Sequence, residues 1–247
     1  MCKCCGQPAE LYGVVDFHKN CNVRQGKVLP LAGIPIYYHR CAACGFVFTK
    51  AFDHFSAPDF ARHIYNAEYI VVDPEYADVR PDANAAHVAQ LLGNNKSIRI
   101  LDFGGGNGRL ASRLQSAGFT DVHTYDPFVA GSADRPVGQF DLVLSFEVAE
   151  HSPTPRQTLS EMASFLSPQG IVLFSTLVQP SQFDEMGVNW WYVSPRNGHL
   201  SIFSRRSLEV LAGSLGFNLG SFNDDLHILV RQFPPFAAHW MGGTKPA

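Results

Sequence analysis

The stretch Ile100-Leu-Asp-Phe-Gly-Gly-Gly-Asn-Gly108 decides the fold of this chain. An apolar run ends at an acidic residue and opens into a glycine-rich turn, and apolar residues then follow at helical spacing from Leu110. This order predicts a strand, a tight turn and a helix. Glycines allow a ligand to approach the backbone closely, and the first turn of a helix offers N–H groups without an internal partner. The stretch therefore predicts a ligand site at a strand–helix junction.

The spacing of the glycines excludes two common phosphate-binding loops. Gly104, Gly106 and Gly108 follow the pattern G-x-G-x-G. Arg109 stands where the dinucleotide fingerprint requires a glycine, and no Gly-Lys-Ser/Thr follows to make a P-loop. A turn preceded by Asp102, without phosphate-binding chemistry, suits a ligand that has an amino-acid end and no phosphate. S-Adenosylmethionine is such a ligand, and we expect Asp102 to help hold its ammonium group.

Three further segments follow the glycine turn in the order known from one enzyme family. Together the four segments resemble the motifs of class I S-adenosylmethionine-dependent methyltransferases of the small-molecule or sugar type. The later segments resemble the acidic end of the second strand, the fourth strand with its Glu-Val-x-Glu-His ending, and the turn into the fifth strand. They are Tyr125–Pro127, Phe140–His151 and Leu166–Thr176. The resemblance covers about residues 80–232 and implies methyl transfer from S-adenosylmethionine.

Along the chain, strand-like segments alternate with helix-like segments. Such alternation predicts a parallel sheet with helices on both faces. The resemblance implies a Rossmann-like α/β sheet that is mostly parallel and ends in an antiparallel hairpin. The expected strands are 98–103, 121–125, 141–146, 170–176, 217–222 and 227–232, and the expected helices are 83–92, 107–117, 155–166 and 204–216.

Residues 127–140 depart from the family pattern. The family usually places a third strand, a helix and an adenine-contacting acid between the second and fourth strands. This segment has room for a short strand at most. We therefore expect an adenine pocket that is reduced or built from other residues.

Several residues at strand ends are expected to border the cofactor, because ligands of open α/β sheets bind beyond the carboxyl ends of the strands. The resemblance implies that the glycine turn meets the methionine part and that Asp126 accepts both ribose hydroxyls. Phe146 and Glu147 end the fourth strand and are expected to lie beside the cofactor. Two simpler interpretations stay open: Asp126 could merely form the turn before Pro127, and Phe146 could merely pack in the core.

The candidate catalytic residues follow the fourth and fifth strands. Methyl transfer requires alignment of the acceptor with the methyl group, and a base is needed only if the acceptor must lose a proton. Histidine suits that task near neutral pH. Glu150 and His151 are expected beside the methyl group, and His199 is a second candidate base. Alternatively, His151 caps the turn that follows it.

The segment Asn189–Phe203 resembles the substrate-side insertion of this methyltransferase subfamily. Its aromatic and basic side chains offer a stacking surface and a partner for an anion, as an acceptor pocket needs. A lid that packs without chemistry is the alternative. The candidate acceptor-binding residues are Trp190, Trp191, Tyr192 and Arg196.

All six cysteines lie at the beginning of the chain, and four of them form two C-x-x-C-G knuckles. Each knuckle lets two thiolates hold one metal while its glycine permits a tight turn, so that two knuckles complete a tetrahedral site. In a reducing compartment this pattern predicts structural zinc and not disulfides. The predicted ligands are Cys2, Cys5, Cys41 and Cys44.

The spacer between the knuckles is long, so we expect the zinc site to fold around an intervening hairpin. Cys4 could replace Cys2, and His18 and Cys21 are further candidate ligands. A redox dithiol or a set of free thiols is the alternative to zinc. A zinc module ahead of such a domain also resembles the sugar C-methyltransferases of deoxysugar biosynthesis, which are longer.

The sequence suggests a linear division of the chain. We expect a zinc-binding module at 1–50, an aromatic linker or cover at 51–80, the methyltransferase domain at 81–232 and an irregular tail at 233–247. No apolar run reaches the roughly 18 residues of a membrane span, and the N-terminus does not resemble a secretory signal. The expected location is therefore the cytoplasm.

The overall charge bears on the class of substrate. The formal net charge is −3 and the sequence pI is near 6.3, which argues against nucleic acid as the main partner. A small-molecule or sugar-type acceptor is favoured. The alternatives are a protein or RNA methyltransferase that uses the zinc module for recognition, and a non-catalytic zinc-containing binding protein. The sequence indicates neither the acceptor nor the oligomeric state.

Overall fold

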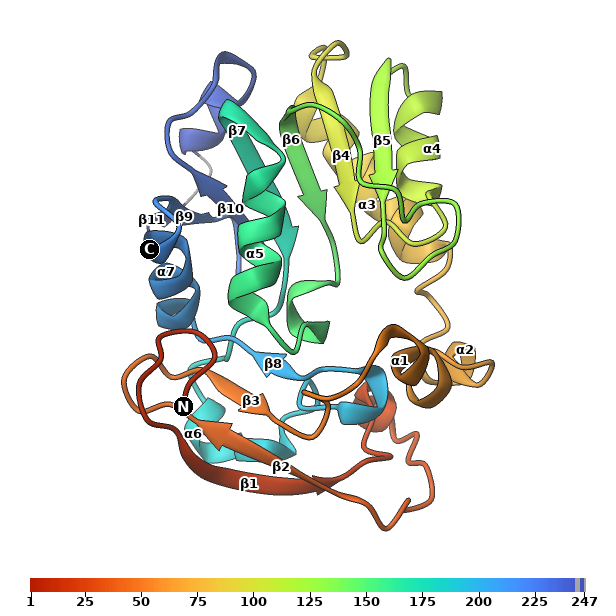
Figure 1. The fold of residues 1–247 in the computed structure, drawn as a ribbon, viewed down its shortest axis with the longest axis vertical. Helices are drawn as coiled ribbons and strands as arrows, with labels where there is room; N and C mark the ends of the chain where they lie inside the picture. Colours follow the sequence, from red (N-terminus) through yellow and green to blue (C-terminus); the bar gives the residue numbers. More distant parts are fainter. Residues whose placement is uncertain (243–244, 247) are drawn as a thin grey trace. The chain divides into compact units, whose positions relative to one another are not determined.

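Two separate β-sheets organise the computed structural model, which describes residues 1–242 and 245–246 (Figure 1). The chain forms two compact units that interleave along the sequence. Unit 1 contains Met1–Pro74, Ala149–Thr158 and Leu177–Leu211, and unit 2 contains Glu75–Val148, Leu159–Thr176 and Ala212–Ala247. The linear division expected at residues 50, 80 and 232 stays a prediction.

Unit 2 carries a seven-stranded sheet in the order β11-β9-β10-β7-β6-β4-β5. The four strands β7, β6, β4 and β5 run parallel, and β10 is antiparallel to both β7 and β9. This arrangement confirms the predicted Rossmann-like sheet with its antiparallel hairpin. The strands are β4 (Arg99–Phe103), β5 (Asp121–Tyr125), β6 (Phe140–Ser145), β7 (Leu166–Ser175), β9 (Asn218–Ser221), β10 (Leu226–Val230) and β11 (Lys245–Pro246).

The core of unit 2 explains why these strands read as continuous apolar runs. Leu142 and Leu144 on β6 and Leu173 on β7 are fully buried, as expected for parallel strands covered on both faces. Helices α3 (Val79–Leu92) and α4 (Arg109–Ser116) pack against each other and add buried apolar residues to this core.

The shortened segment predicted after β5 contains no helix or strand between residues 127 and 139. Strand β5 is therefore the edge of the sheet as far as the described residues show. The corresponding third strand of the family is missing, as the length of the segment predicts.

Unit 1 carries a four-stranded antiparallel sheet in the order β1-β2-β3-β8. Strands β1 and β2 pair as a long hairpin between the two cysteine knuckles, as the sequence predicts. The strands are β1 (Glu10–Asp16), β2 (Pro35–Arg40), β3 (Val47–Thr49) and β8 (Ser201–Ile202). Strand β8 comes from a distant part of the chain, after β7.

Short helices complete the fold, and the aromatic segment after residue 50 contributes to the core of unit 1. Phe52, Phe60 and Tyr69 are buried in the same cluster as Trp190 and Tyr192. The remaining α-helices are α1 (Ala57–His63), α2 (Tyr69–Val72), α5 (Pro155–Ser164), α6 (Phe183–Met186) and α7 (Arg205–Ser214), and the 3-10 helices are η1 (Cys21–Gln25), η2 (Ala149–His151), η3 (Gly187–Asn189), η4 (Pro195–Asn197) and η5 (Pro235–Gly242).

The prediction of an irregular tail from residue 233 is wrong for the part that the structure describes. Helix η5 covers residues 235–242, and 245–246 pair with β9; residues 243–244 and 247 lie outside the described chain. Trp240 is the physical reason, because its buried ring packs on Phe222 and Phe236 and its Nε1–H donates to the carbonyl of Leu91 at 3.3 Å. No helix of the described residues is long and apolar enough to cross a membrane.

Candidate functional site

The glycine turn of unit 2 joins β4 to α4 in a conformation that only glycine adopts readily. Gly104, Gly106 and Gly108 have φ angles of +73°, +54° and +74°. Gly105 lacks a positive φ but has no room for a side chain, since a Cβ there would lie 2.6 Å from Cγ of Asp102 and 2.8 Å from Cγ2 of Thr124. The turn is therefore held tightly against the end of the sheet.

Asp102 lies on β4, just before this turn, and is only 2% exposed. Burial, and then the nearby Asp126 carboxylate, raise the pKa of Asp102 to about 7. Its Oδ2 atom has no hydrogen-bond partner among residues 1–242 and 245–246. A buried carboxylate without a partner is costly, so this group is suited to a cationic ligand.

Two hydroxyl groups at neighbouring strand ends share this property. Ser145 is the last residue of β6, Thr176 directly follows β7, and β4, β6 and β7 are adjacent in the sheet. Within the described chain, Ser145 Oγ and Thr176 Oγ1 are buried without a hydrogen-bond partner. Buried polar groups are normally satisfied. Three such groups at the carboxyl ends of adjacent strands therefore indicate the place of a polar ligand.

Asp126 follows β5 and makes two contacts: one within the turn before Phe128 that the sequence offered as an alternative, and one with the glycine turn that the sequence did not suggest. Its Oδ1 accepts a hydrogen bond from the N–H of Phe128 at 2.9 Å, which fixes the turn. Its Oδ2 accepts one from the N–H of Gly106 at 3.0 Å, which fixes the glycine turn. Each carboxylate oxygen can accept a second hydrogen bond, so the predicted contact with ribose hydroxyls stays a prediction compatible with this geometry.

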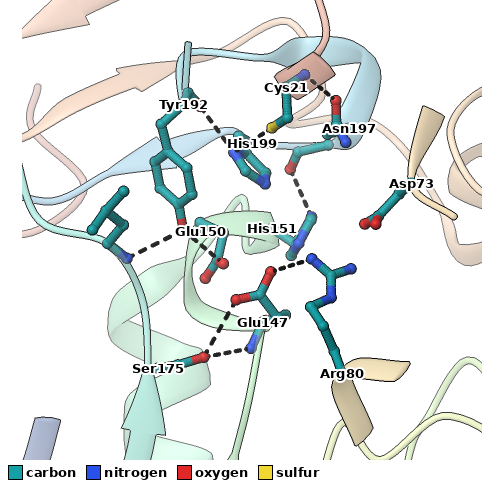
Figure 2. Close-up of polar contacts among 12 residues, drawn as sticks. Cys21, Asp73, Arg80, Glu147, Glu150, His151, Ser175, Tyr192, Asn197 and His199 are labelled. Carbon is teal, nitrogen blue, oxygen red and sulfur yellow. Dashed lines mark hydrogen bonds and ion pairs between the residues drawn. The ribbon is translucent and has the colours of Figure 1, made fainter. Parts of the chain in front are cut away.

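Glu147 is the one non-glycine residue with a positive φ, +57°, in the part of the chain that the structure describes. Its N–H donates to Ser175 Oγ at 3.0 Å, and its Oε2 accepts from Arg80 Nη1 at 3.0 Å (Figure 2). Such backbone strain is typical of ligand sites. Phe146 beside it is half-buried against the core, so its contact with the cofactor stays a prediction.

Unit 1 brings together the three candidate catalytic residues (Figure 2). Glu150 and His151 lie on η2, and His199 lies between η4 and β8. The N–H of Leu200 donates to the Glu150 carbonyl at 2.8 Å and fixes the two segments side by side. The imidazole centroids of His151 and His199 are 5.0 Å apart. From the sequence, only the family resemblance suggested that these residues lie close to one another.

Hydrogen bonds to backbone carbonyls orient both imidazoles. His151 Nδ1 lies 3.1 Å from the carbonyl oxygen of Gly198, and His199 Nδ1 lies 2.8 Å from that of Tyr192. Because a carbonyl only accepts, each contact places the proton on Nδ1 and the ring lone pair on Nε2. Tyr192 donates its hydroxyl to Glu150 Oε1 at 2.8 Å. The geometry therefore brings two imidazoles and one carboxylate together, with one ligand atom of each within 4.8 Å of the others.

Sequence reasoning missed two neighbours of this cluster. Cys21 Sγ lies 3.9 Å from His199 Nδ1, and the N–H of Cys21 donates to Asn197 Oδ1 at 2.8 Å (Figure 2). Neither contact follows from spacing, since the residues are far apart in sequence. Cys21 is therefore not part of the cluster formed by Cys2, Cys5, Cys41 and Cys44.

The candidate acceptor-binding residues are largely engaged within unit 1. Trp190 and Tyr192 are each 4% exposed, whereas Trp191 is half-buried under the Arg24 guanidinium, 4.2 Å from its ring centroid. Arg196 donates to the Ile64 carbonyl at 2.9 Å and to the side chain of Asn66 at 3.2 Å. These contacts give the segment a packing role, and its contact with an acceptor stays a prediction.

The two cysteine knuckles meet, as predicted. Cys2 Sγ is 3.7 Å from Cys44 Sγ, and Cys5 Sγ is 3.4 Å from Cys41 Sγ. In a tetrahedral zinc site with Zn–S bonds of about 2.3 Å, neighbouring sulfurs lie about 3.8 Å apart. The glycines that follow the knuckles, Gly6 and Gly45, have φ of +74° and +75° and donate their N–H groups back to the first cysteine of each knuckle. Cys4 stays outside the group.

These features define an α/β domain of the methyltransferase type, and comparison with known proteins identifies the family. A sequence family described as a methyltransferase domain matches residues 76–221. This match covers more than half of the chain, and the chain therefore belongs to this methyltransferase family. The resemblance to a methyltransferase domain is confirmed.

Curated relatives share only part of their length with this chain. The ubiquinone biosynthesis O-methyltransferase of Burkholderia vietnamiensis is 30% identical over 102 residues, which are 32% of this chain and 44% of that protein. The tRNA U34 carboxymethyltransferase of Chromohalobacter salexigens is 30% identical over 141 residues, 46% of this chain and 41% of that protein. The chain thus spans less than half the length of these relatives.

Among solved structures, CalO1, a methyltransferase of calicheamicin biosynthesis in an SAH-bound form, superposes with a TM-score of 0.50. The identity is 18%, and the match covers 73% of this chain and 63% of that one. At this identity the likeness shows the fold.

Proposed function

We propose that the chain transfers a methyl group from S-adenosylmethionine to a small-molecule or sugar-type acceptor. One observation supports this more than any other. Three buried polar groups that have no hydrogen-bond partner among the described residues, on Asp102, Ser145 and Thr176, lie at adjacent carboxyl ends of the parallel sheet. Ligands of open α/β sheets bind there. The same edge carries the glycine turn, which leaves room for a ligand close to the backbone.

The ammonium, carboxylate and ribose groups of the cofactor have chemical counterparts in unit 2. The Asp102 carboxylate would hold the ammonium group, and the N–H groups of the glycine turn would meet the carboxylate of the methionine part. Asp126 would accept the ribose hydroxyls, and Phe146 and Glu147 would border the ligand. Calorimetry with S-adenosylmethionine, its demethylated product and NAD tests this assignment. Binding of NAD alone would refute it.

The acceptor side of the reaction is assigned to unit 1. The cofactor already carries an activated methyl group, so that the protein must align the acceptor and, where necessary, take its proton. Glu150, His151 and His199 are the proposed groups for this proton transfer, with Trp190, Trp191, Tyr192 and Arg196 shaping the surroundings. A screen of acceptors with isotopically labelled cofactor tests the substrate class. Methylation of protein or RNA alone would favour a protein or RNA methyltransferase. Cofactor binding without methylation of any acceptor would favour a non-catalytic binding protein.

The pH dependence of cofactor binding is expected to report on Asp102. With a pKa near 7, this carboxyl is protonated at lower pH, and it must ionise to hold an ammonium group. Affinity for S-adenosylmethionine should therefore fall as the pH drops from 7 to 5, by about tenfold per unit. Calorimetry across this range checks the slope. Asp102→Asn should bind weakly and without the slope; a variant that retains the wild-type slope would contradict this prediction.

A structural zinc ion is proposed for the cysteine cluster of unit 1. The four thiols come together as two knuckles with the sulfur spacing of a tetrahedral site. Such an ion would fix the start of the chain to the loop between β2 and β3. This role is independent of the methyl transfer assigned above.

Metal analysis of the purified protein should find one zinc bound to the cysteine cluster. Cys2→Ser should lose this metal and lower the melting temperature, because structural zinc contributes directly to folding. Cys4→Ser is the matched control and should retain the metal, since Cys4 lies outside the group. The opposite result would make Cys4 the ligand, and a metal-free wild-type protein with unchanged stability would refute the zinc site.

A further inference from the structure

The cluster of Glu150, His151 and His199 has the composition of a second metal site. Each residue offers one ligand atom, and these atoms all lie within 4.8 Å of one another. Glu150 and His199 are buried, at 0% and 4% exposure. In a metal shell with bonds of about 2.0–2.2 Å, neighbouring ligand atoms are about 3–3.5 Å apart. Side-chain shifts of about 1 Å would therefore close the three groups around an ion.

The three side chains are already oriented as metal ligands usually are. Metal-binding histidines commonly donate the second ring N–H to a carbonyl, and ligating carboxylates accept a further hydrogen bond. Here the Nδ1 atoms of His151 and His199 face backbone carbonyls, and Glu150 Oε1 accepts from Tyr192. Both Nε2 atoms thus carry the lone pair that a cation requires.

Position 198, beside this cluster, requires a glycine because a side chain there would disturb the orientation of His151. Gly198 has a φ of +85°, and a Cβ there would lie 3.0 Å from His151 Nδ1. The absent side chain lets the Gly198 carbonyl receive the imidazole proton at 3.1 Å. The backbone conformation at Gly198 therefore supports the orientation of His151.

We propose that Glu150, His151 and His199 bind a divalent transition-metal ion, distinct from zinc at the cysteine cluster. Two imidazoles and one carboxylate are a ligand set for Fe²⁺, Mn²⁺, Co²⁺ or Zn²⁺, whereas Mg²⁺ and Ca²⁺ prefer oxygen ligands. Three protein ligands leave coordination positions open. The ligand class that fits these positions is an acceptor with one hydroxyl, or two adjacent hydroxyls.

The chemical consequence of this ion rests on the proposed function, while its binding does not. A divalent ion lowers the pKa of an oxygen group bound to it. An acceptor hydroxyl would then lose its proton near neutral pH, and the two imidazoles would act on the acceptor through the ion instead of taking its proton directly. The hydroxyl proton would pass to solvent, and the acceptor oxygen would form a bond to the methyl carbon while the carbon–sulfur bond of S-adenosylmethionine breaks. The demethylated thioether product would leave with the electron pair of that bond.

Cobalt titration of the full chain tests the site. Protein with zinc retained at the cysteine cluster is dialysed against a weak chelator and titrated with Co²⁺, followed by visible absorption. We expect one further Co²⁺ per chain without the thiolate charge-transfer band that cobalt at cysteine would produce. Glu150→Gln and His199→Ala should lose this site. Tyr192→Phe removes the hydroxyl that donates to Glu150 and that accepts from the N–H of Leu177. It should weaken the metal site by about tenfold.

His87→Ala provides the matched control, because His87 is exposed on α3 of unit 2 and should leave the titration unchanged. Circular dichroism establishes that each variant is folded, and Tyr192→Phe carries the test if Glu150→Gln does not fold. A wild-type protein that binds no additional Co²⁺, or a folded Glu150→Gln variant that binds it fully, would overturn the proposal. Calorimetry with S-adenosylmethionine on the same samples reports separately on the proposed function.

Discussion

Gly105→Ala is expected to abolish binding of S-adenosylmethionine and of its demethylated product. The new Cβ would lie 2.6 Å from Asp102 Cγ and 2.8 Å from Thr124 Cγ2, distances that real Cβ atoms do not show. Either the buried carboxylate or the turn must move, and both changes remove the group that would hold the ammonium. Calorimetry should detect no binding, which at ordinary protein concentrations means a loss of at least about a hundredfold.

Gly213→Ala is the control for this change. Gly213 lies in helix α7 with no atom within 4 Å of an added Cβ and without a positive φ, so alanine should be neutral or slightly stabilising there. Wild-type affinity in Gly105→Ala would show that the ligand does not use this turn, and it would remove the main support for the cofactor assignment.

His151→Ala and His199→Ala should each lower turnover on any accepted substrate by about a hundredfold or more, with cofactor affinity nearly unchanged. The reason is that both imidazoles lie in one cluster with Glu150, with their Nδ1 atoms held by backbone carbonyls. Loss of a group that promotes proton transfer typically costs 10²–10⁴-fold. Steady-state kinetics with saturating cofactor, together with calorimetry, separates the two effects.

His54→Ala is the matched variant for these histidines, because His54 is exposed in the same unit and lies outside the cluster. It should retain wild-type turnover. If both cluster variants also kept full activity, the enzyme would work by alignment of the acceptor alone, and neither histidine would take part in proton transfer.

The sequence predicted the parts of the fold that depend on local signals. The glycine turn and the strands around it could be located because tight turns and buried parallel strands have characteristic residue patterns. Strand β5 was expected at 121–125 and is found at Asp121–Tyr125, and the loss of the third strand followed from the length of residues 127–140. Both observations require only a short stretch of chain.

Contacts between distant segments could not be predicted in the same way. The hydroxyl of Tyr192 on Glu150, the carbonyl of Gly198 on His151, and Cys21 beside His199 depend on how unit 1 folds. Arg196 illustrates the difficulty, because its charge suggested an anion partner while its guanidinium donates to the Ile64 carbonyl. The helix at the tail also depends on a distant contact, because Trp240 packs on Phe222 and Phe236.

The interleaved order of the two units restricts which segments of the chain can be removed without disturbing the others. The chain passes between the units at residues 74–75, 148–149, 158–159, 176–177 and 211–212. Strand β8, next to His199, hydrogen-bonds to β3, which follows the second cysteine knuckle. Deletion of the first 74 residues would thus leave β8 without its neighbour. The cysteine knuckles, His151 and His199 therefore belong to one compact unit that is built from three separate segments of the chain.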